Sequence, residues 1–163
     1  MAMILDFRTV DPRDWILVND DVMGGRSSSQ LTLTEEGTGV FSGFVSLENN
    51  GGFASTRVST GTLDLSRHQG VILRVRGDGR RYQLRFRTQE GSRGLAYKGE
   101  FDTGKNVWEE VYLPFHEFRA TFRGYRPPEA PPLDPACIRQ VGFLIADKME
   151  GPFRLEVAWV KGK

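Results

Sequence analysis

The sequence predicts an all-β protein that folds as a β-sandwich or jelly roll. Apolar residues alternate with polar ones through many short segments, as a strand that is buried on one face requires. Clusters of Gly, Asp, Asn and Pro separate these segments at short intervals, and no segment has the apolar spacing of an amphipathic helix of three or four turns. Because short strands recur without a helical period, two packed antiparallel sheets are the expected architecture.

Alternation is clearest in three segments, 39–47, 71–76 and 82–88, where apolar residues tend to alternate with Ser, Gln or Arg. Each of these segments is therefore expected to bury one face and expose the other. Weaker patterns predict further strands around them. In chain order, the expected strands are 29–34, 39–47, 52–58, 71–76, 82–88, 95–101, 107–113, 139–145 and 153–160.

Asp78 and Gly79 separate the strands expected at 71–76 and 82–88. An Asp-Gly pair between two alternating segments is typical of a tight hairpin turn, with the glycine at positive φ. The same stretch contains Arg76-Gly77-Asp78, a tripeptide that cell-surface adhesion receptors recognise, but the flanking alternation favours the hairpin. We therefore predict a hairpin that joins these two strands.

One long segment, 119–135, interrupts the pattern of strands. Its prolines exclude a central strand and most helical conformations, because proline lacks a backbone donor and has a fixed φ. We expect a surface loop that crosses from one sheet to the other, although long loops in compact domains are often functional. The prolines are Pro127, Pro128, Pro131, Pro132 and Pro135.

The chain has 163 residues, and we expect a single domain over 1–163 whose core is large enough to fold without a disulfide or a metal. Cys137 is the only cysteine, and His68 and His116 are the only histidines. Neither an internal disulfide nor a structural zinc site can therefore be assembled. Cys137 lies between two apolar residues, which predicts a small buried side chain. No metal and no cofactor are predicted.

The charges of the chain are nearly balanced, with 22 Lys and Arg against 21 Asp and Glu. This balance removes the strongest electrostatic argument for nucleic-acid binding. No stretch approaches the ~20 apolar residues that a membrane-spanning helix needs, so no membrane span is expected. The N-terminus shows no basic leader followed by an apolar run. From these features we expect a cytoplasmic protein.

The most unusual chemistry lies in two polar segments centred on glycine pairs, 19–28 and 47–55. Glycine pairs allow positive φ and close approach of the backbone, and the flanking Asn and Asp side chains supply donors and acceptors. We expect the two segments to lie close together, with residues 147 and 148 near them. The candidate partner- or ligand-binding residues are Asn19, Asp20, Arg26, Asn49, Asn50, Asp147 and Lys148.

Two interpretations of this polar cluster are open. It can be a buried hydrogen-bond network that holds loops together, because Asn and Asp satisfy backbone groups left unpaired at the ends of a sandwich. It can also be a surface that binds a ligand or a partner. The variant Asn49→Ala separates the two: a network predicts a loss of ~1 to 3 kcal/mol of stability, whereas a binding role predicts near-normal stability with lost partner capture.

Other sites receive less support from the sequence. Residues 23–27 lack the GxxxxGK[ST] spacing of a phosphate-binding loop, and the spacing around Asp20 and Asp21 does not match a regular calcium loop. No nucleophile-elbow pattern or convincing acid–base pair is present, so no catalytic activity is predicted. Trp15, Trp108 and Trp159 could form a sugar-stacking platform, but their apolar surroundings favour packing in the core.

A series of motifs runs through nearly the whole chain. These motifs are Trp15, 18–27, 41–43, 48–55, 76–79, Tyr82, Trp108, 113–115, 142–143, 147–148 and 151–153. In type and order they resemble the complex I intermediate-associated protein 30 family. The resemblance implies a galactose-binding-domain-like jelly-roll β-sandwich, a fold shared with many carbohydrate-binding modules, and no catalytic activity.

Mitochondrial members of that family assist the assembly of respiratory complex I. This chain is little more than the domain itself and lacks an Arg- and Ser-rich leader, so we expect a compact bacterial relative. The predicted function is a non-catalytic binding or assembly-factor domain that recognises a protein partner, such as a subunit of a respiratory or other membrane-associated redox complex. The alternative is a carbohydrate-binding module. Exposed aromatic side chains on a sheet face would favour sugar, and an apolar patch with an arginine rim would favour protein.

Overall fold

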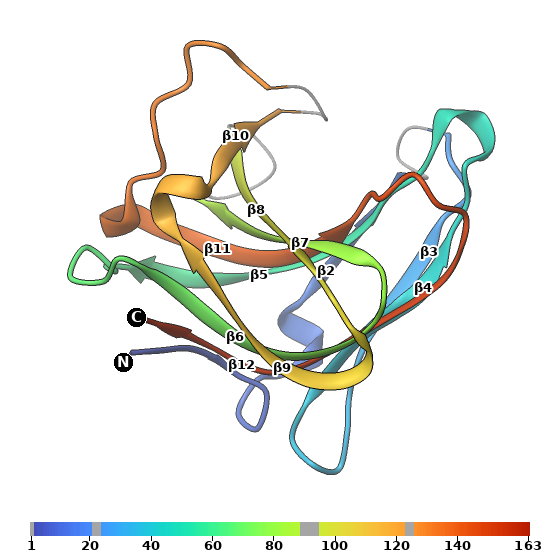
Figure 1. Cartoon of the computed structure of the whole chain (residues 1–163), viewed down its shortest axis with the longest axis horizontal. Helices are drawn as coiled ribbons and strands as arrows, with labels where there is room; N and C mark the ends of the chain where they lie inside the picture. The colour runs from blue at the N-terminus through green and yellow to red at the C-terminus, as the bar shows by residue number, and fades with distance from the viewer. Residues whose placement is uncertain (1, 21–23, 89–94, 123–125) are drawn as a thin grey trace.

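The chain forms two antiparallel β-sheets that pack against each other (Figure 1). The computed structural model describes residues 2–20, 24–88, 95–122 and 126–163. In this part of the chain the helical elements are short 3₁₀ turns, namely η1 (Pro12–Asp14), η3 (Glu48–Asn50), η4 (Phe115–Glu117) and η5 (Pro135–Cys137). The prediction of an all-β sandwich is confirmed.

Among the described residues, sheet A has six strands, of which five follow the order β3-β4-β12-β6-β9. The sixth strand, β1, pairs with the last residues of β12, beyond the part of β12 that pairs with β4. The strands are β1 (Met3–Asp6), β3 (Ser28–Leu33), β4 (Gly39–Val45), β6 (Gly70–Asp78), β9 (Lys105–Pro114) and β12 (Gly151–Gly162).

In the part of the chain that the structure describes, sheet B also has six strands, in the order β10-β8-β7-β11-β5-β2. Its central strand β11 pairs with β7 on one side and with β5 on the other. The strands are β2 (Ile16–Asn19), β5 (Ala54–Leu63), β7 (Arg81–Arg87), β8 (Ala96–Asp102), β10 (Arg119–Thr121) and β11 (Ile138–Ile145). The short strands β1 and β2 were not predicted, because four residues give too little alternation to recognise.

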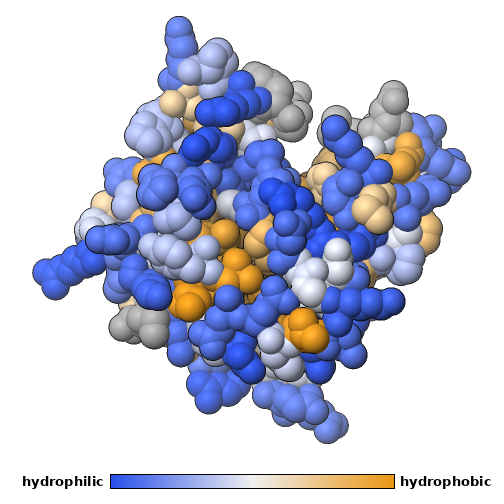
Figure 2. Space-filling view, in the orientation of Figure 1, coloured by the Kyte–Doolittle hydropathy of each residue, from blue (hydrophilic) through white to orange (hydrophobic). Residues whose placement is uncertain are grey.

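The hydrophobic core fills the space between the inner faces of the two sheets. Alternate residues of β6, such as Leu73 and Val75, face it from sheet A, and alternate residues of β7 and β11, such as Phe86 and Phe143, face it from sheet B. These side chains are almost completely inaccessible to solvent. In the orientation of Figure 1 the surface is mostly hydrophilic, and hydrophobic side chains are visible mainly near the centre of the view (Figure 2).

The three tryptophans have different surroundings. Trp15 is buried and stacks between Phe7 and Phe143, with ring centroids 5.6 and 6.4 Å away, so the prediction of core packing is confirmed for this residue. Trp108 and Trp159 are half-buried instead. The prediction is wrong for these two because both lie on the outer face of sheet A, in register with the outward-facing Arg76 and Arg74.

The turn at Asp78 and Gly79 has the predicted backbone conformation but not the predicted role. Gly79 has φ +90°, yet β6 belongs to sheet A and β7 to sheet B. The hairpin prediction is therefore wrong, and the turn carries the chain from one sheet to the other. Asp-Gly identifies a turn with positive φ, but it does not determine whether the flanking strands pair with each other or with other strands.

Cys137 also differs from its prediction. It is exposed, because it lies in η5, just before β11 enters the sheet. The prediction that the proline-rich segment crosses from one sheet to the other is wrong, because β10 before the prolines and β11 after them both belong to sheet B. In the described part of this segment, the regular elements are the short strand β10, at the edge of sheet B, and the start of the turn η5. An edge position is the one at which such a segment can join a sheet.

Candidate functional site

The two diglycine segments meet at the carboxylate of Asp20, which is fully buried. From its own segment, the backbone N–H of Ser27 donates to Oδ1 at 2.8 Å and the Ser27 hydroxyl donates to Oδ2 at 2.5 Å. From the other segment, the N–H groups of Gly52 and Phe53 donate to Oδ2 at 2.6 and 3.3 Å. The prediction that the two segments lie close together is confirmed.

The glycines of both pairs make room for this carboxylate. A Cβ atom added to Gly25 would collide with the Asp20 side chain, and so would a Cβ atom added to Gly51. Gly24 and Gly52 have φ values of +88° and +130°, which other residues rarely adopt. One glycine of each pair therefore provides space and the other provides the turn.

The environment of Asp20 favours its charged form. Burial alone would raise the pKa of this carboxyl, but the hydrogen bonds from Ser27, Gly52 and Phe53 outweigh it, so the pKa is lowered. Because these bonds come from the chain itself and the carboxylate is inaccessible, Asp20 holds the loops together. For Asp20 the geometry supports the network interpretation.

The other predicted residues of these segments have different environments. Asn19 is half-buried, and its Oδ1 accepts hydrogen bonds from the Ser29 hydroxyl at 2.6 Å and from the backbone of Ser55 at 3.3 Å. Arg26 is 70 % exposed and lies 3.4 Å from the carboxylate of Glu48. Asn49 is exposed, with φ +56° in η3. The variant Asn49→Ala is therefore not expected to leave buried partners unpaired. Asn50 closes η3.

Asp147 and Lys148 do not join the Asp20 network through their own side-chain contacts. Asp147 forms an ion pair of 2.6 Å with Arg80, and both side chains are more than nine-tenths buried. Burial alone would raise the pKa of Asp147, but the hydrogen bond and charge of Arg80 lower it. Lys148 is exposed, with φ +62°. The connection between β11 and β12, which contains Asp147 and Lys148, contacts the second diglycine segment through Glu150. The Glu150 carboxylate accepts a hydrogen bond of 3.2 Å from Leu47 N–H.

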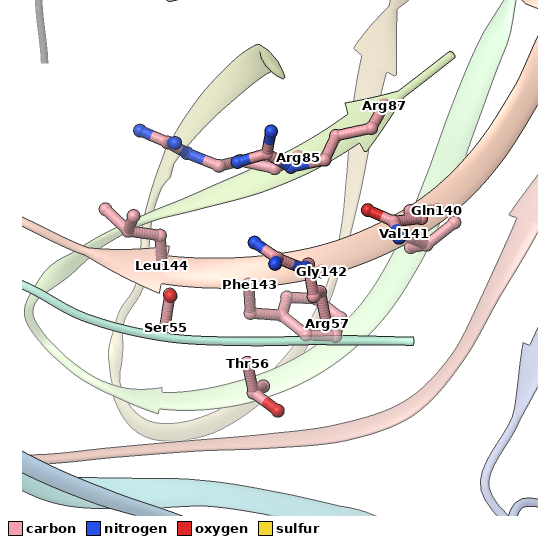
Figure 3. Close-up of a pocket in the computed structure, with 10 residues that line it drawn as sticks. All are labelled: Ser55, Thr56, Arg57, Arg85, Arg87, Gln140, Val141, Gly142, Phe143 and Leu144. Carbon is pink, nitrogen blue, oxygen red and sulfur yellow. The ribbon is translucent and has the colours of Figure 1, made fainter. Parts of the chain in front are cut away.

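A second group of polar residues, which the sequence analysis missed, lies on the outer face of sheet B. Arg57 is on β5, and Arg85 and Arg87 are on β7; β11 runs between these two strands. Gly142 of β11 pairs with Arg57 on one side and with Arg85 on the other, so Arg57, Gly142 and Arg85 lie in line across the sheet. Arg87 lies two residues beyond Arg85 on β7. Figure 3 shows the three arginine side chains gathered around this part of β11. We call Arg57, Arg85 and Arg87 the arginine row.

The arginine row has no counter-charge in ion-pair contact within the part of the chain that the structure describes: no carboxylate oxygen lies within 4 Å of these guanidinium groups. Arg85 donates to the side-chain oxygen of Gln83 at 2.9 Å. The Nε of Arg57 is buried and has no acceptor among the described residues. By contrast, Arg76 is paired with Glu156 at 2.7 Å.

The electrostatics of the row are unfavourable in the isolated protein. Burial and the nearby charge of Arg87 lower the pKa of Arg85 to about 10. Burial and the charge of Arg57 lower the pKa of Arg87, and burial lowers that of Arg57. All three groups remain charged at neutral pH. An anion bound beside them would relieve both the lost hydration and the mutual repulsion.

A small pocket of about 30 Å³ lies at the arginine row. Gln140, Gly142 and Leu144 of β11 line it together with Ser55 (Figure 3). Gln140 and Leu144 are at most 6 % exposed although they belong to the outer face, so neighbouring side chains cover most of β11 on this face. The pocket presents cationic and amide groups beside a short apolar surface, a combination suited to an anionic group on a larger molecule.

A broader depression lies on the outer face of sheet A, lined by Asp78, Arg80 and Arg154 among others. The charged side chains of Asp78 and Arg80 already form hydrogen bonds or ion pairs within the chain. Asp78 accepts hydrogen bonds from Arg154 N–H and from the Tyr82 hydroxyl, at 2.8 and 3.0 Å, and Arg80 is paired with Asp147. This depression therefore offers less unpaired charge than the arginine row.

Comparison with known proteins decides the family. The profile of the complex I intermediate-associated protein 30 family matches residues 5–157 of the chain. The chain belongs to this family. A relative from Mus musculus, named "Complex I intermediate-associated protein 30, mitochondrial", is 28% identical over 97% of the chain. A relative of the same name from Drosophila melanogaster is 27% identical, also over 97% of the chain.

The chain spans 55% of the mouse relative and 61% of the fruit-fly relative, so it corresponds to little more than half the length of these family members. The prediction of a cytoplasmic location is wrong, since both relatives are named as mitochondrial. That prediction rested on the N-terminus of the sequence, which does not determine the compartment. The expectation of a bacterial protein finds no support either, because both relatives come from animals.

Solved structures with the same fold include carbohydrate-binding modules. A family 11 carbohydrate-binding module from Clostridium thermocellum superposes with a TM-score of 0.68 at 18% identity, over 96% of this chain and 93% of that one. An agarase superposes with a TM-score of 0.65 at 10% identity, over 99% of this chain and 24% of the agarase. These likenesses confirm the galactose-binding-domain-like jelly roll and, at such low identity, show the fold alone.

Two further observations concern the described residues only. No group of three or more His, Cys, Asp or Glu side chains is placed there so that it could hold a metal ion. No helix there is long and apolar enough to cross a membrane. The arginine row was missed because its members are distant in the sequence. The alternation of Arg85 and Arg87 in β7 was visible, but the position of Arg57 beside them depends on the insertion of β11 between β5 and β7.

Proposed function

We propose that this chain is a non-catalytic binding domain that takes part in the assembly of mitochondrial complex I and recognises a protein partner through the outer face of sheet B. Membership of the complex I intermediate-associated protein 30 family supports the assembly role. We further propose that residues 1–163 act as one domain, since the core cluster extends from Leu5 to Val160.

The arginine row is the observation that carries this proposal. Removing arginine side chains partly from water without a compensating charge has a free-energy cost, so such a group contributes little to the stability of the isolated fold. Arginine is enriched in protein–protein interfaces, where its planar guanidinium group binds carboxylates and carbonyls of a partner. A cationic face whose members pair with no carboxylate in their own chain fits an interface better than a structural role.

Carbohydrate binding receives less support from the same observations. On the central strands of sheet B, the outward-facing residues of β5, β7 and β11 include no aromatic side chain on which a sugar ring could stack. On sheet A, cations already cover the indole rings. Arg74 and Arg76 lie 5.3 and 5.1 Å from the ring centre of Trp108, and Lys161 lies 4.1 Å from that of Trp159.

Genetic complementation tests the proposed function. The gene for this chain is deleted in its source organism, and assembled complex I is quantified on native gels after re-expression in mitochondria. We expect the wild-type chain to restore assembly and the triple variant Arg57→Gln, Arg85→Gln, Arg87→Gln to restore much less of it. The control is Arg67→Gln, which changes an exposed arginine between β5 and β6. Normal complex I in the deletion strain would overturn the assembly role.

The exposed members of the predicted site, Arg26, Asn49 and Lys148, are proposed as a separate contact with a partner. Their exposure leaves them available, and none of them holds the Asp20 network through its side chain. The double variant Arg26→Ala, Lys148→Ala belongs in the same complementation assay. Reduced assembly with an unchanged unfolding curve would support a contact at these loops, and normal assembly would exclude it.

A further inference from the structure

We propose that the arginine row binds an acidic segment of the partner protein, in extended conformation, with carboxylate side chains on alternate residues. This inference rests on the proposed function and names the chemistry of its interface. Its basis is the spacing of the three arginines along and across their strands, together with their unpaired charge.

The spacing of the row exceeds the size of a single small anion. Arg57 and Arg85 lie on β5 and β7, which are separated by the one strand β11. Adjacent strands are about 4.8 Å apart, so the backbones of these two residues are about 10 Å apart. Arg85 and Arg87 are two residues apart on one strand, which corresponds to about 7 Å. A row of this extent accommodates two or more carboxylates at the same time.

A segment of chain would lie over the arginine side chains and not against β11 itself. At Gly142, between Arg57 and Arg85, a Cβ atom would collide with the Thr56 carbonyl oxygen and come within 2.9 Å of Arg57 Cβ, so β5 already packs over this glycine. A segment that runs along β11 would have Arg57 on one side and Arg85 with Arg87 on the other. In an extended segment, residues i and i+2 point to the same side and are about 7 Å apart, which matches the separation of Arg85 and Arg87. Guanidinium groups bind carboxylates with two parallel hydrogen bonds.

The charge pattern around the row favours an acidic occupant over a neutral one. Lys98 pairs in register with Arg85 and Arg119 with Lys98, so cationic residues continue the row across β8 to the edge strand β10. Glu100 is on the same face, but it forms ion pairs with Arg81 at 2.8 Å and with Lys98 at 3.2 Å. An acidic segment would therefore meet the unpaired charge of Arg57, Arg85 and Arg87 beside the paired charges of Lys98 and Glu100.

Fluorescence anisotropy with a defined peptide tests the proposal. The probe is a fluorescein-labelled nonapeptide in which Glu and Ser alternate, and the comparison peptide has the same composition with all Glu residues contiguous. We expect the wild-type chain to bind the alternating peptide more tightly, with affinity that decreases as salt rises from about 50 to 300 mM. The triple arginine-to-glutamine variant should bind at least about tenfold more weakly. Arg67→Gln should bind like the wild type.

A second variant tests the geometry of recognition. Arg85→Lys keeps the charge but removes the planar pair of donors, so its affinity should fall between those of the wild type and Arg85→Gln. Far-UV circular dichroism and unfolding curves establish that each variant is folded. Equal binding by the triple variant and the wild type, or no peptide binding at all, would overturn the proposal.

Vesicles and sugars distinguish other occupants. Vesicles containing phosphatidylglycerol, and soluble mixed-linkage glucan fragments, are tested with the same proteins. Binding of either through the arginine row, without binding of the acidic peptide, would overturn the acidic-segment proposal. The complementation assay separates this outcome from failure of the proposed function. If the triple variant fails to restore complex I while no acidic peptide binds, the interface stands and its chemistry is wrong; if the triple variant restores complex I fully, the interface itself is wrong.

Discussion

At the scale of single residues, buried charged side chains have two different relationships to the chain. Asp20 and Asp147 are surrounded by donors from their own chain, and the pKa of each is lowered despite burial. Arg57, Arg85 and Arg87 have no such partners among the described carboxylates, and their pKa values are lowered because the charged form is disfavoured. The first group is neutralised within the fold, whereas the second group lacks a counter-charge there.

The first prediction concerns Asp20. The variant Asp20→Ala leaves the buried N–H of Ser27 and the partly buried N–H groups of Gly52 and Phe53 without their acceptor, so we expect a loss of about 3 kcal/mol in the free energy of unfolding. Urea denaturation measures it. Asp102→Ala is the control, because Asp102 is 76% exposed and its pair with Arg81 contributes little. Equal stability of the two variants would contradict a network centred on Asp20.

The second prediction concerns acid. Folding lowers the pKa of Asp20, Asp147 and Glu156, so the folded protein binds protons on these groups less readily than the unfolded chain does. Their contribution to stability is complete above the unfolded pKa of about 4 and is lost as the pH falls through the lower folded pKa. The free energy of unfolding should therefore decrease below about pH 4, and this decrease should be smaller in Asp20→Asn. If stability depends on pH in the same way in that variant, Asp20 does not contribute to the loss of stability in acid.

At the scale of elements, turns decide how strands are shared between the sheets. The turn after β6 directs the chain into the other sheet, where β7 pairs with β8 and β11. Asp78 fixes this turn from both sides, because it accepts hydrogen bonds from the Tyr82 hydroxyl on β7 and from the Arg154 N–H on β12. The Gly79 N–H donates to the Thr103 hydroxyl at 3.1 Å. One aspartate thus joins β7 of sheet B to β6 and β12 of sheet A.

The third prediction concerns this turn. Gly79 has φ +90°, which a β-branched residue adopts only with strain, so Gly79→Val should lower the free energy of unfolding by roughly 1 kcal/mol or more. Gly79→Asn is the matched variant and should lose less, because asparagine tolerates positive φ better than valine does. Denaturation midpoints of the three proteins provide the measurement. An unchanged midpoint for the valine variant would show that the turn relaxes without cost.

At the scale of the whole molecule, the two sheets share one core and have different outer faces. On sheet A, charged side chains are paired or lie over aromatic rings, as in Arg76 with Glu156 and Trp108. On sheet B, the arginine row has neither kind of partner among the described residues. The two outer faces of the sandwich therefore differ in how far their arginines are neutralised within the chain.

The fourth prediction follows from that asymmetry. Replacement of a half-buried, repelled cation by an apolar side chain of similar length removes a desolvation cost, so Arg85→Met should raise the free energy of unfolding by about 0.5 to 1 kcal/mol. The same variant should lose assembly activity in the complementation assay. Urea denaturation and native gels measure the two effects. A marked loss of stability would instead assign Arg85 a structural role.

The sequence by itself determined the properties that depend on neighbouring residues. Alternation in 71–76 and 82–88 predicted strands at the places where β6 and β7 lie, and the glycine of Asp78-Gly79 predicted a positive φ. The matching polar segments predicted that Asp20 and the Gly51–Gly52 pair belong together. These features were accessible because side-chain periodicity and turn chemistry act within a few residues.

Only the tertiary structure decided which strands pair and which outward side chains become neighbours. It assigned β6 and β7 to different sheets and exposed Cys137 in η5. It also inserted β11 between β5 and β7, which placed Arg57 beside Arg85 across Gly142. The order of the strands is set by the requirement that all inner faces are buried in one core. This requirement applies to the whole chain, so it cannot be inferred from the residues of one segment. The arginine row exists only because that condition is met.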